Sequence, residues 1–291
     1  MDTTSQFNTG QGFVFDGIAA CIEHSIPSTH EIPKELHNKQ NDDSLMSVEC
    51  ATMFVELLCK FVSGEYKNDV HSSTQATFYL ENVYNYRCHF SNLSKATRVL
   101  RAETTDMDIL LWEKVLLALN FISISSDMDA SLKGIDSFQR ILLQTKIDSV
   151  PSKSWLFVLD LISEKHPPVE NEAVRVKAFD LFIRMLLMHV PNLCKESANM
   201  EALTSITHRM ATLIAENLSV GRQGNISALF ESTVQLVTNL SNVLLMPEFS
   251  SEPKFTKWAG NYLFEQLDKN GVGGGSARMM NATSSRETQD V

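Results

Sequence analysis

The stretch ASLKGIDSFQRILL, residues 130–143, recurs as VRVKAFDLFIRMLL at residues 174–187, so the second copy begins 44 residues after the first (174 − 130). Identical side chains stand at six aligned positions: Lys133/Lys177, Asp136/Asp180, Phe138/Phe182, Arg140/Arg184, Leu142/Leu186 and Leu143/Leu187. The apolar residues in each copy recur at spacings of three and four, which places them on one face of a helix. Each copy is therefore predicted to be an amphipathic helix.

A repeat of about 40–47 residues with two helices per unit is typical of HEAT and armadillo proteins, in which each hairpin buries its apolar face against the next. The two copies are then the inner helices of adjacent units, with four matching buried side chains, Phe138, Leu142, Phe182 and Leu186. The small residues Gly134 and Ala178 share one register, where neighbouring helices can approach closely. Chance similarity between two amphipathic helices is the alternative explanation.

Acidic residues precede both copies, as Asp127-Met-Asp129 and Glu170-Asn-Glu172. Negative side chains stabilise the positive end of a helix macrodipole, so both stretches are expected to mark helix N-termini.

Helical periodicity continues along the chain, and strict alternation of the kind found in strands is hard to find. The predicted fold class is all-α, a HEAT/armadillo-like α-solenoid of stacked helix hairpins. Proline and glycine set several boundaries: Pro151, Pro167-Pro168, Pro191, Gly221–Gly224 and Pro247–Pro253. The predicted helices are 13–25, 45–63, 74–103, 106–124, 129–146, 152–164, 170–190, 197–219, 224–245 and 254–268. Short connections between them predict antiparallel neighbours.

Three segments are predicted. Residues 1–44 hold an N-terminal helix and a flexible linker, because 27–44 are polar and contain few large apolar residues. Residues 45–268 form the helical repeat domain. Residues 269–291 form a disordered tail rich in glycine and serine.

Charge and composition exclude several classes of function. The formal net charge is −10, which disfavours non-specific attraction to nucleic acid or to anionic lipid. Five scattered cysteines (Cys21, Cys50, Cys59, Cys88 and Cys194) form no C-x-x-C pair and are expected to be reduced. No basic segment precedes an apolar stretch at the N-terminus, and no apolar run approaches the roughly 18 residues of a membrane span. The expectation is a soluble, cytoplasmic chain.

Residues for catalysis or metal binding are not grouped in the sequence. The eight histidines form no H-E-x-x-H motif, and the adjacent Cys88 and His89 point to different sides of a helix. The glycine-rich 270–276 is not followed by the Lys-Ser/Thr pair of a phosphate-binding loop. Carboxylate pairs such as Asp127/Asp129 lie in polar turns. We therefore predict no catalytic residue, no cofactor and no metal site.

Several features resemble the C-terminal solenoid of the large Golgi-type Arf guanine-nucleotide exchange factors, the brefeldin-A-resistance-factor/GNOM class. These are Leu111-Trp112 leading into 115–122, the string Phe138-Gln-Arg-Ile-Leu-Leu143, Trp155 with Val158-Leu159, Val174-Arg175 through Ala178, His189-Val-Pro191 with Leu193, 242–246 and Trp258. The resemblance covers roughly residues 45–268. Two departures are Ser131, where the family tends to carry arginine, and 45–80, which matches only in helical character.

The resemblance implies a non-catalytic regulatory module. Exchange activity in that family resides in a Sec7 domain, and no segment of this chain resembles one. The expected partners are proteins, namely other regions of an exchange factor and Arf-pathway or Golgi proteins. The chain is expected to be cytoplasmic and to associate peripherally with Golgi membranes. Recruitment would occur through a protein partner or through a local basic patch such as Lys254/Lys257. The competing hypothesis is a general protein-binding solenoid or transport adaptor. An enzyme is a third class for which the sequence offers no support.

Overall fold

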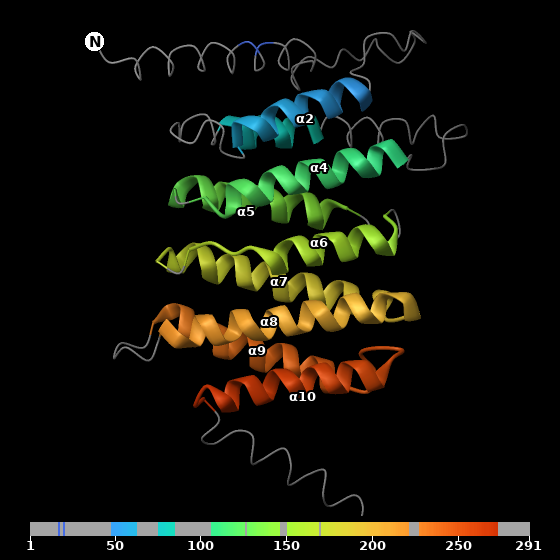
Figure 1. The fold of residues 1–291 in the computed structure, drawn as a ribbon, viewed down its shortest axis with the longest axis vertical. Helices are drawn as coiled ribbons and strands as arrows, with labels where there is room; N and C mark the ends of the chain where they lie inside the picture. The colour runs from blue at the N-terminus through green and yellow to red at the C-terminus, as the bar shows by residue number, and fades with distance from the viewer. Residues whose placement is uncertain are drawn as a thin grey trace, which may run out of the picture. The chain divides into compact units, whose positions relative to one another are not determined.

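The computed structural model describes residues 17, 20, 48–62, 75–84, 106–125, 127–145, 150–168, 170–220 and 227–272. The chain divides into two compact units, 1–150 and 151–291. Within the described residues both units are helical, without a β-strand (Figure 1). The all-α prediction is confirmed at this level. The predicted repeat domain 45–268 spans both units, and its limits stay a prediction.

The first unit contains α2 (Val48–Val62), a helical segment at 75–84, α4 (Asp106–Ser123) and α5 (Met128–Gln144). Helix α4 packs against both α2 and α5. The indole N–H of buried Trp112 donates to Thr145 Oγ1 at 3.0 Å, at the C-terminal cap of α5. Arg140 and Glu81 form an ion pair at 2.8 Å, and the Ser137 hydroxyl donates to the same carboxylate oxygen. These bonds join α5 to α4 and to 75–84.

The α4–α5 hairpin is tight at Gly134. A Cβ at this position would lie 2.9 Å from the backbone nitrogen of Ser123 and 3.0 Å from Cγ2 of Ile122. Because only glycine fits without a shift of the backbone, the close approach expected at this register is confirmed at Gly134; at Ala178 it stays a prediction. Asp127 caps α5 by accepting from the backbone N–H of Ala130 at 2.7 Å, as its position before the helix predicted.

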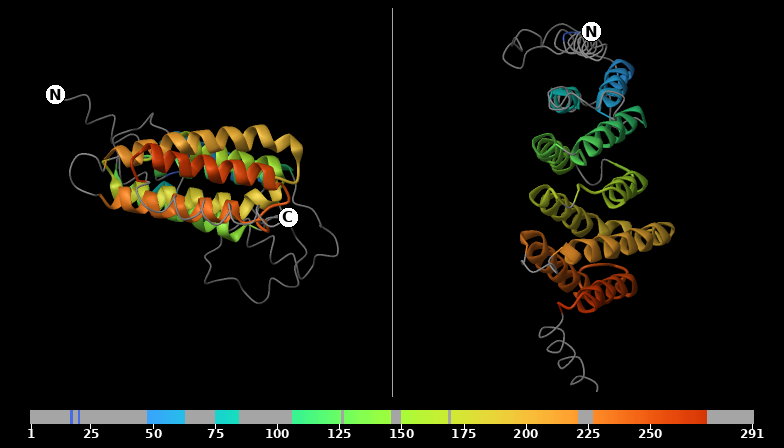
Figure 2. Two further views of the ribbon diagram at one scale, coloured as in Figure 1. Left: turned by 90° about the horizontal axis from the view of Figure 1, so that it is seen from below. Right: turned by 60° about the vertical axis from the view of Figure 1, so that its left-hand side comes forward.

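The second unit contains α6 (Ser152–Glu164), α7 (Glu172–Leu193), the short 3-10 helix η4 (Ser197–Asn199), α8 (Met200–Val220), α9 (Ala228–Leu245) and α10 (Pro253–Lys269). Its helices form two layers: α6, α8 and α10 contact one another in order, while α7 and α9 pack together behind them (Figures 1 and 2). Contacts of α6 with α7, α8 with α9 and α9 with α10 join the layers. This arrangement is consistent with an α-solenoid.

The two sequence copies occupy α5 and α7. Phe138, Leu142, Phe182 and Leu186 are all buried, as predicted. Glu172, in the second acidic stretch and the first turn of α7, contacts another helix. Its carboxylate accepts a hydrogen bond from the backbone N–H of Leu229 at the start of α9. The aligned copies are therefore core helices of both units.

Most predicted helix boundaries fall within a few residues of the observed ones, with one correction. Pro191 does not end its helix, because α7 continues to Leu193. The fixed φ of proline fits a helix, and the backbone N–H of Cys194 still bonds to the Val190 carbonyl at 2.9 Å. Only Gly17 and Ala20 of the predicted helix 13–25 are described, and both are helical.

Other predictions lie outside the described residues: the helix beyond residue 84 up to 103, the linker 27–44, the break at Gly221–Gly224, Cys21, Cys88, His89 and the tail after Val272. At the end of α10, Gly271 adopts φ +83°, a left-handed conformation that terminates the helix. Within the described residues, Cys59 and Cys194 form no disulfide.

Candidate functional site

The described residues contain no group of three or more His, Cys, Asp and Glu side chains that could hold a metal ion. None of the helices described in the structure is long and apolar enough to cross a bilayer. Two clusters in the second unit, one buried and one at the surface, instead bring together polar or aromatic side chains from distant parts of the sequence.

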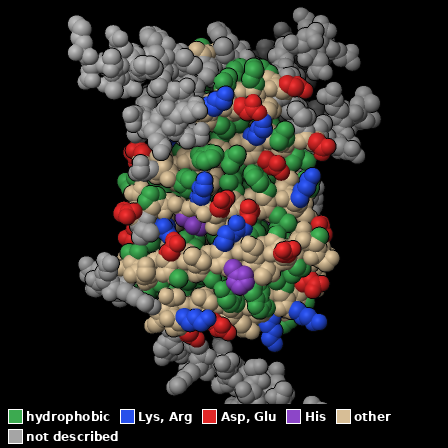
Figure 3. Space-filling model, viewed as in Figure 1, with side chains coloured by type: hydrophobic (Ala, Val, Ile, Leu, Met, Phe, Trp, Pro, Cys, Tyr) green, Lys and Arg blue, Asp and Glu red, His purple; other side chains and the backbone are tan. Residues whose placement is uncertain are grey.

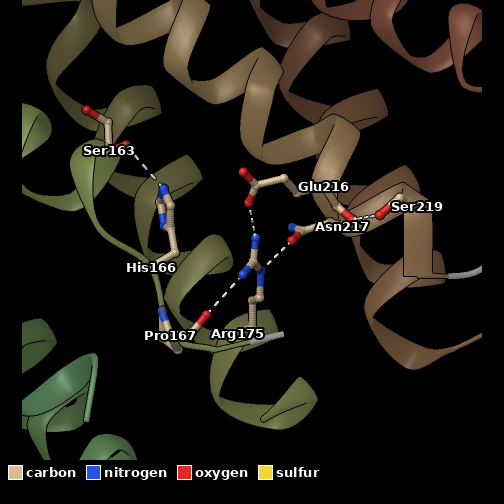
Figure 4. Close-up of polar contacts among 7 residues, drawn as sticks. All are labelled: Ser163, His166, Pro167, Arg175, Glu216, Asn217 and Ser219. Atoms are coloured by element: carbon tan, nitrogen blue, oxygen red, sulfur yellow. Dashed lines mark hydrogen bonds and ion pairs between the residues drawn. The ribbon is translucent and has the colours of Figure 1, made fainter. Parts of the chain in front are cut away.

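The buried cluster surrounds Arg175 in the first turn of α7 (Figure 4). Arg175 is 4% exposed, and its guanidinium donates three hydrogen bonds. Nε donates to Asn217 Oδ1 at 2.6 Å, Nη1 to the Pro167 carbonyl at 3.0 Å and Nη2 to Glu216 Oε2 at 2.7 Å. The planar guanidinium thus joins α7 to α8 and to the segment that follows α6, a geometry that lysine cannot reproduce.

Arg175 aligns with Ser131 of the first copy, and the two side chains make equivalent contacts. The buried Ser131 hydroxyl donates to the Ser125 carbonyl at 2.9 Å, in the turn before α5. Arg175 donates to the Pro167 carbonyl in the turn before α7. At this repeat position, therefore, either side chain ties the start of a helix to the preceding turn. The cluster is a structural element of the fold.

Two histidines of the second unit are held neutral by burial. His189 on α7 is 1% exposed and stacks on Trp155 of α6, with ring centroids 3.8 Å apart. Neither ring nitrogen of His189 has a hydrogen-bond partner in the described part of the chain, and desolvation lowers its pKa to about 4. Desolvation, and then the charge of Arg175, lower the pKa of His166 to about 4 as well.

This burial predicts that acidification weakens the second unit. In the unfolded chain these histidines have a pKa near 6.5, whereas in the folded chain their pKa is about 4. Acid therefore favours the unfolded chain: the free energy of unfolding keeps its full value above about pH 6.5 and falls as the pH drops from 6.5 to 4. For His189 alone, lowering the pH from 7.5 to 5.0 is expected to cost about 2 kcal/mol. Urea unfolding followed by circular dichroism at both pH values measures the change.

The matched variant is His189→Phe, which keeps an aromatic ring against Trp155 and removes the titrating group. It should be at least as stable as the natural chain at pH 7.5, because no hydrogen bond is lost, and should lose much less stability at pH 5.0. Equal acid sensitivity of the two proteins contradicts the assignment to His189.

The second cluster, which we name the aromatic surface, comprises His208 of α8 with Phe255, Trp258 and Tyr262 of α10. The Trp258 and Tyr262 rings are stacked with centroids 5.5 Å apart and an interplanar angle of 11°. His208 meets both rings edge-on, at 5.6 and 5.0 Å, and its Nδ1 lies 3.0 Å from the Tyr262 hydroxyl. Trp258 remains 37% exposed and His208 is exposed. The rings are thus fixed to one another while part of their surface faces solvent.

Two lysines flank the aromatic surface. Lys254 and Lys257, the basic pair noted in the sequence, are exposed on the first turns of α10. Neither forms an ion pair within the residues that the structure describes. In Figure 3, hydrophobic side chains gather at the level of α8 and α10, and Lys or Arg side chains lie near the N-terminal end of α10.

No protein family, no curated protein and no solved structure was found to match the chain.

No sequence pattern predicted either cluster as a whole. The sequence alone indicates Trp258 and the basic pair Lys254/Lys257, but His208 is 50 residues before Trp258, and its contact with Trp258 requires α8 to lie beside α10. A usable signal was present in α10, since Phe255, Trp258 and Tyr262 recur at spacings of three and four.

Proposed function

We propose that the chain is a non-catalytic protein-binding module built as a HEAT-like α-solenoid. The observation that carries the proposal is the stacking of α6 to α10 in two layers, together with equivalent buried side chains 44 residues apart in α5 and α7. Repeats of this kind bind partners along an extended surface formed by successive helices. The aromatic surface supplies a part of such a surface where large rings are exposed.

As the more specific proposal, the module is the C-terminal regulatory region of a Golgi-type Arf guanine-nucleotide exchange factor. This proposal is supported by the resemblance to that family at Leu111-Trp112, 138–143, Trp155 and Arg175, which follow one another in the order and at the spacing seen in the family. The contacts of two of these residues suit structural roles: Trp112 on α4 donates to the hydroxyl of Thr145, the C-cap residue of α5, and Arg175 joins α7 to α8. In this proposal the module recruits the exchange factor to Golgi membranes by binding proteins there, and it regulates a Sec7 exchange domain elsewhere in that factor.

A general adaptor is the second candidate, favoured by the aromatic surface because partner binding there requires no exchange domain. The coding sequence upstream of Met1 separates the two. An in-frame Sec7 domain supports the exchange-factor proposal, and an upstream stop codon without one supports the adaptor. Proximity labelling in cells gives a second test: labelled Arf-pathway and Golgi proteins are expected from the first proposal.

The purified chain is expected not to accelerate GDP release from Arf. Exchange requires an acidic side chain presented in a groove to the magnesium-bound nucleotide, whereas acidic residues such as Asp129, Glu201 and Glu231 lie on solvated helix faces of the described part of the chain. Release of a fluorescent GDP analogue from lipid-free Arf measures the rate. An isolated Sec7 domain from a known exchange factor is the positive control, and acceleration by the chain alone above the intrinsic rate contradicts the proposal.

A further inference from the structure

Building on the proposed protein-binding function, we propose that the aromatic surface, with Lys254 and Lys257, binds an acidic peptide segment that carries an aromatic or large aliphatic side chain. The apolar side chain would contact Trp258 and Tyr262, and carboxylates of the peptide would pair with the two lysines.

The rings are arranged in advance for such a contact. Tyr262 is held by the His208 ring from α8 and by stacking on Trp258, so two helices fix its position. Phe255 supports Trp258 from the preceding turn, with centroids 5.7 Å apart. Fixed aromatic side chains lose little conformational entropy on binding, which is why tryptophan and tyrosine dominate the energetics of protein interfaces.

Two ammonium groups lie beside the rings. Lys254 is one helical turn from both Lys257 and Trp258, so the two ammonium groups and the indole share one side of α10. The two lysines have no ion-pair partner in the described part of the chain. Within α10 the acidic residues, Glu265 and Asp268, come in its later turns, and the exposed N-cap residue Glu252 is one carboxylate against the two lysines. A peptide that places its carboxylates near the first turns of α10 is therefore electrostatically complementary.

A peptide fits these observations better than a membrane does. Lipid-binding basic segments carry about four to eight lysines or arginines, and α10 offers two at this site. Membrane-inserting aromatic residues project outward from an amphipathic helix, whereas Trp258 is packed between Phe255 and Tyr262 with most of its surface covered.

The test begins with selection of a phage-displayed library of random peptides, about 12 residues long, on the full chain. Enriched peptides are expected to combine Asp or Glu with Trp, Phe or Leu. The leading peptide is synthesised with a fluorescein label, and its affinity is measured by anisotropy. Lys254→Glu/Lys257→Glu should weaken binding at least tenfold, Trp258→Ala by a similar factor, and rising NaCl should weaken binding to the natural chain.

The matched control is Lys133→Glu/Lys153→Glu, which makes the same change in net charge at two exposed lysines elsewhere and should leave the affinity within twofold. Circular dichroism checks that each variant is folded. Failure to enrich acidic peptides overturns the proposal, as does equal binding to the Lys254→Glu/Lys257→Glu variant. Co-flotation with phosphatidylserine vesicles that this variant abolishes, without peptide binding, assigns the site to a membrane and also overturns it.

These outcomes are separate from those for the proposed function. If proximity labelling still finds protein partners in cells while no acidic peptide is selected, only the inference about the aromatic surface fails. If the natural chain captures no protein partner in cells, the proposed function fails.

Discussion

Replacing Phe138 or Phe182 with alanine is expected to destabilise the unit that contains it by about 3–5 kcal/mol, the usual cost of deleting a large buried ring without full collapse of the cavity. Both rings are among the largest buried side chains of the described residues, and they occupy the same position of the two sequence copies. Hydrogen exchange of the amides in α5 and α7 measures the local opening free energy of each unit.

The matched control for Phe138→Ala is Phe78→Ala, which makes the same chemical change in the first unit at a ring that is 59% exposed. We expect the control to cost less than about 1 kcal/mol, because little apolar area leaves a packed environment. If the two substitutions cost the same, Phe138 does not occupy the core position that the repeat assigns to it.

Replacing Arg175 with methionine should cost the second unit about 2–5 kcal/mol, because each of two buried acceptors left unpaired costs about 1–3 kcal/mol, although methionine fills a similar volume. The substitution leaves the Asn217 amide oxygen and the Pro167 carbonyl buried without their donor, and an unsatisfied buried acceptor is costly. Urea unfolding of the full chain, followed by circular dichroism, measures the loss. Arg175→Lys should recover only part of it, because one ammonium group cannot span the three acceptors.

Arg184→Met is the matched control, on the same helix. Its guanidinium pairs with Asp180 one turn away at 2.7 Å, and the side chain is 60% exposed. Exposed pairs of this kind contribute little, so the expected loss is below about 1 kcal/mol. Glu216→Gln should also be mild, since the Glu216 side chain is 54% exposed and glutamine can still accept from Arg175. A large effect of Arg184→Met with a small effect of Arg175→Met contradicts the role given to Arg175.

Helical periodicity and prolines predicted most of the secondary structure, because both act locally. Pro151 before α6, and Pro253 in the first turn of α10, fix backbone angles wherever the chain packs. Pro191 shows the limit of that signal. Pro191 lies in the last turn of α7, where its fixed φ agrees with the helix and its missing N–H removes only one backbone hydrogen bond. Packing of the buried neighbours Val190 and Leu193 is then sufficient for the helix to continue.

The sequence by itself determined the helical fold class and the buried faces of α5 and α7, since the spacing of Phe138 and Leu142, or of Phe182 and Leu186, places them on one side of any helix. Tertiary structure alone decided where Arg175 and His208 find their partners. Asn217 lies 42 residues after Arg175, and Tyr262 lies 54 residues after His208. No local pattern specifies such pairs, because they depend on which helices become neighbours and on how those helices are rotated. That choice follows from burial of the apolar faces summed over the whole unit.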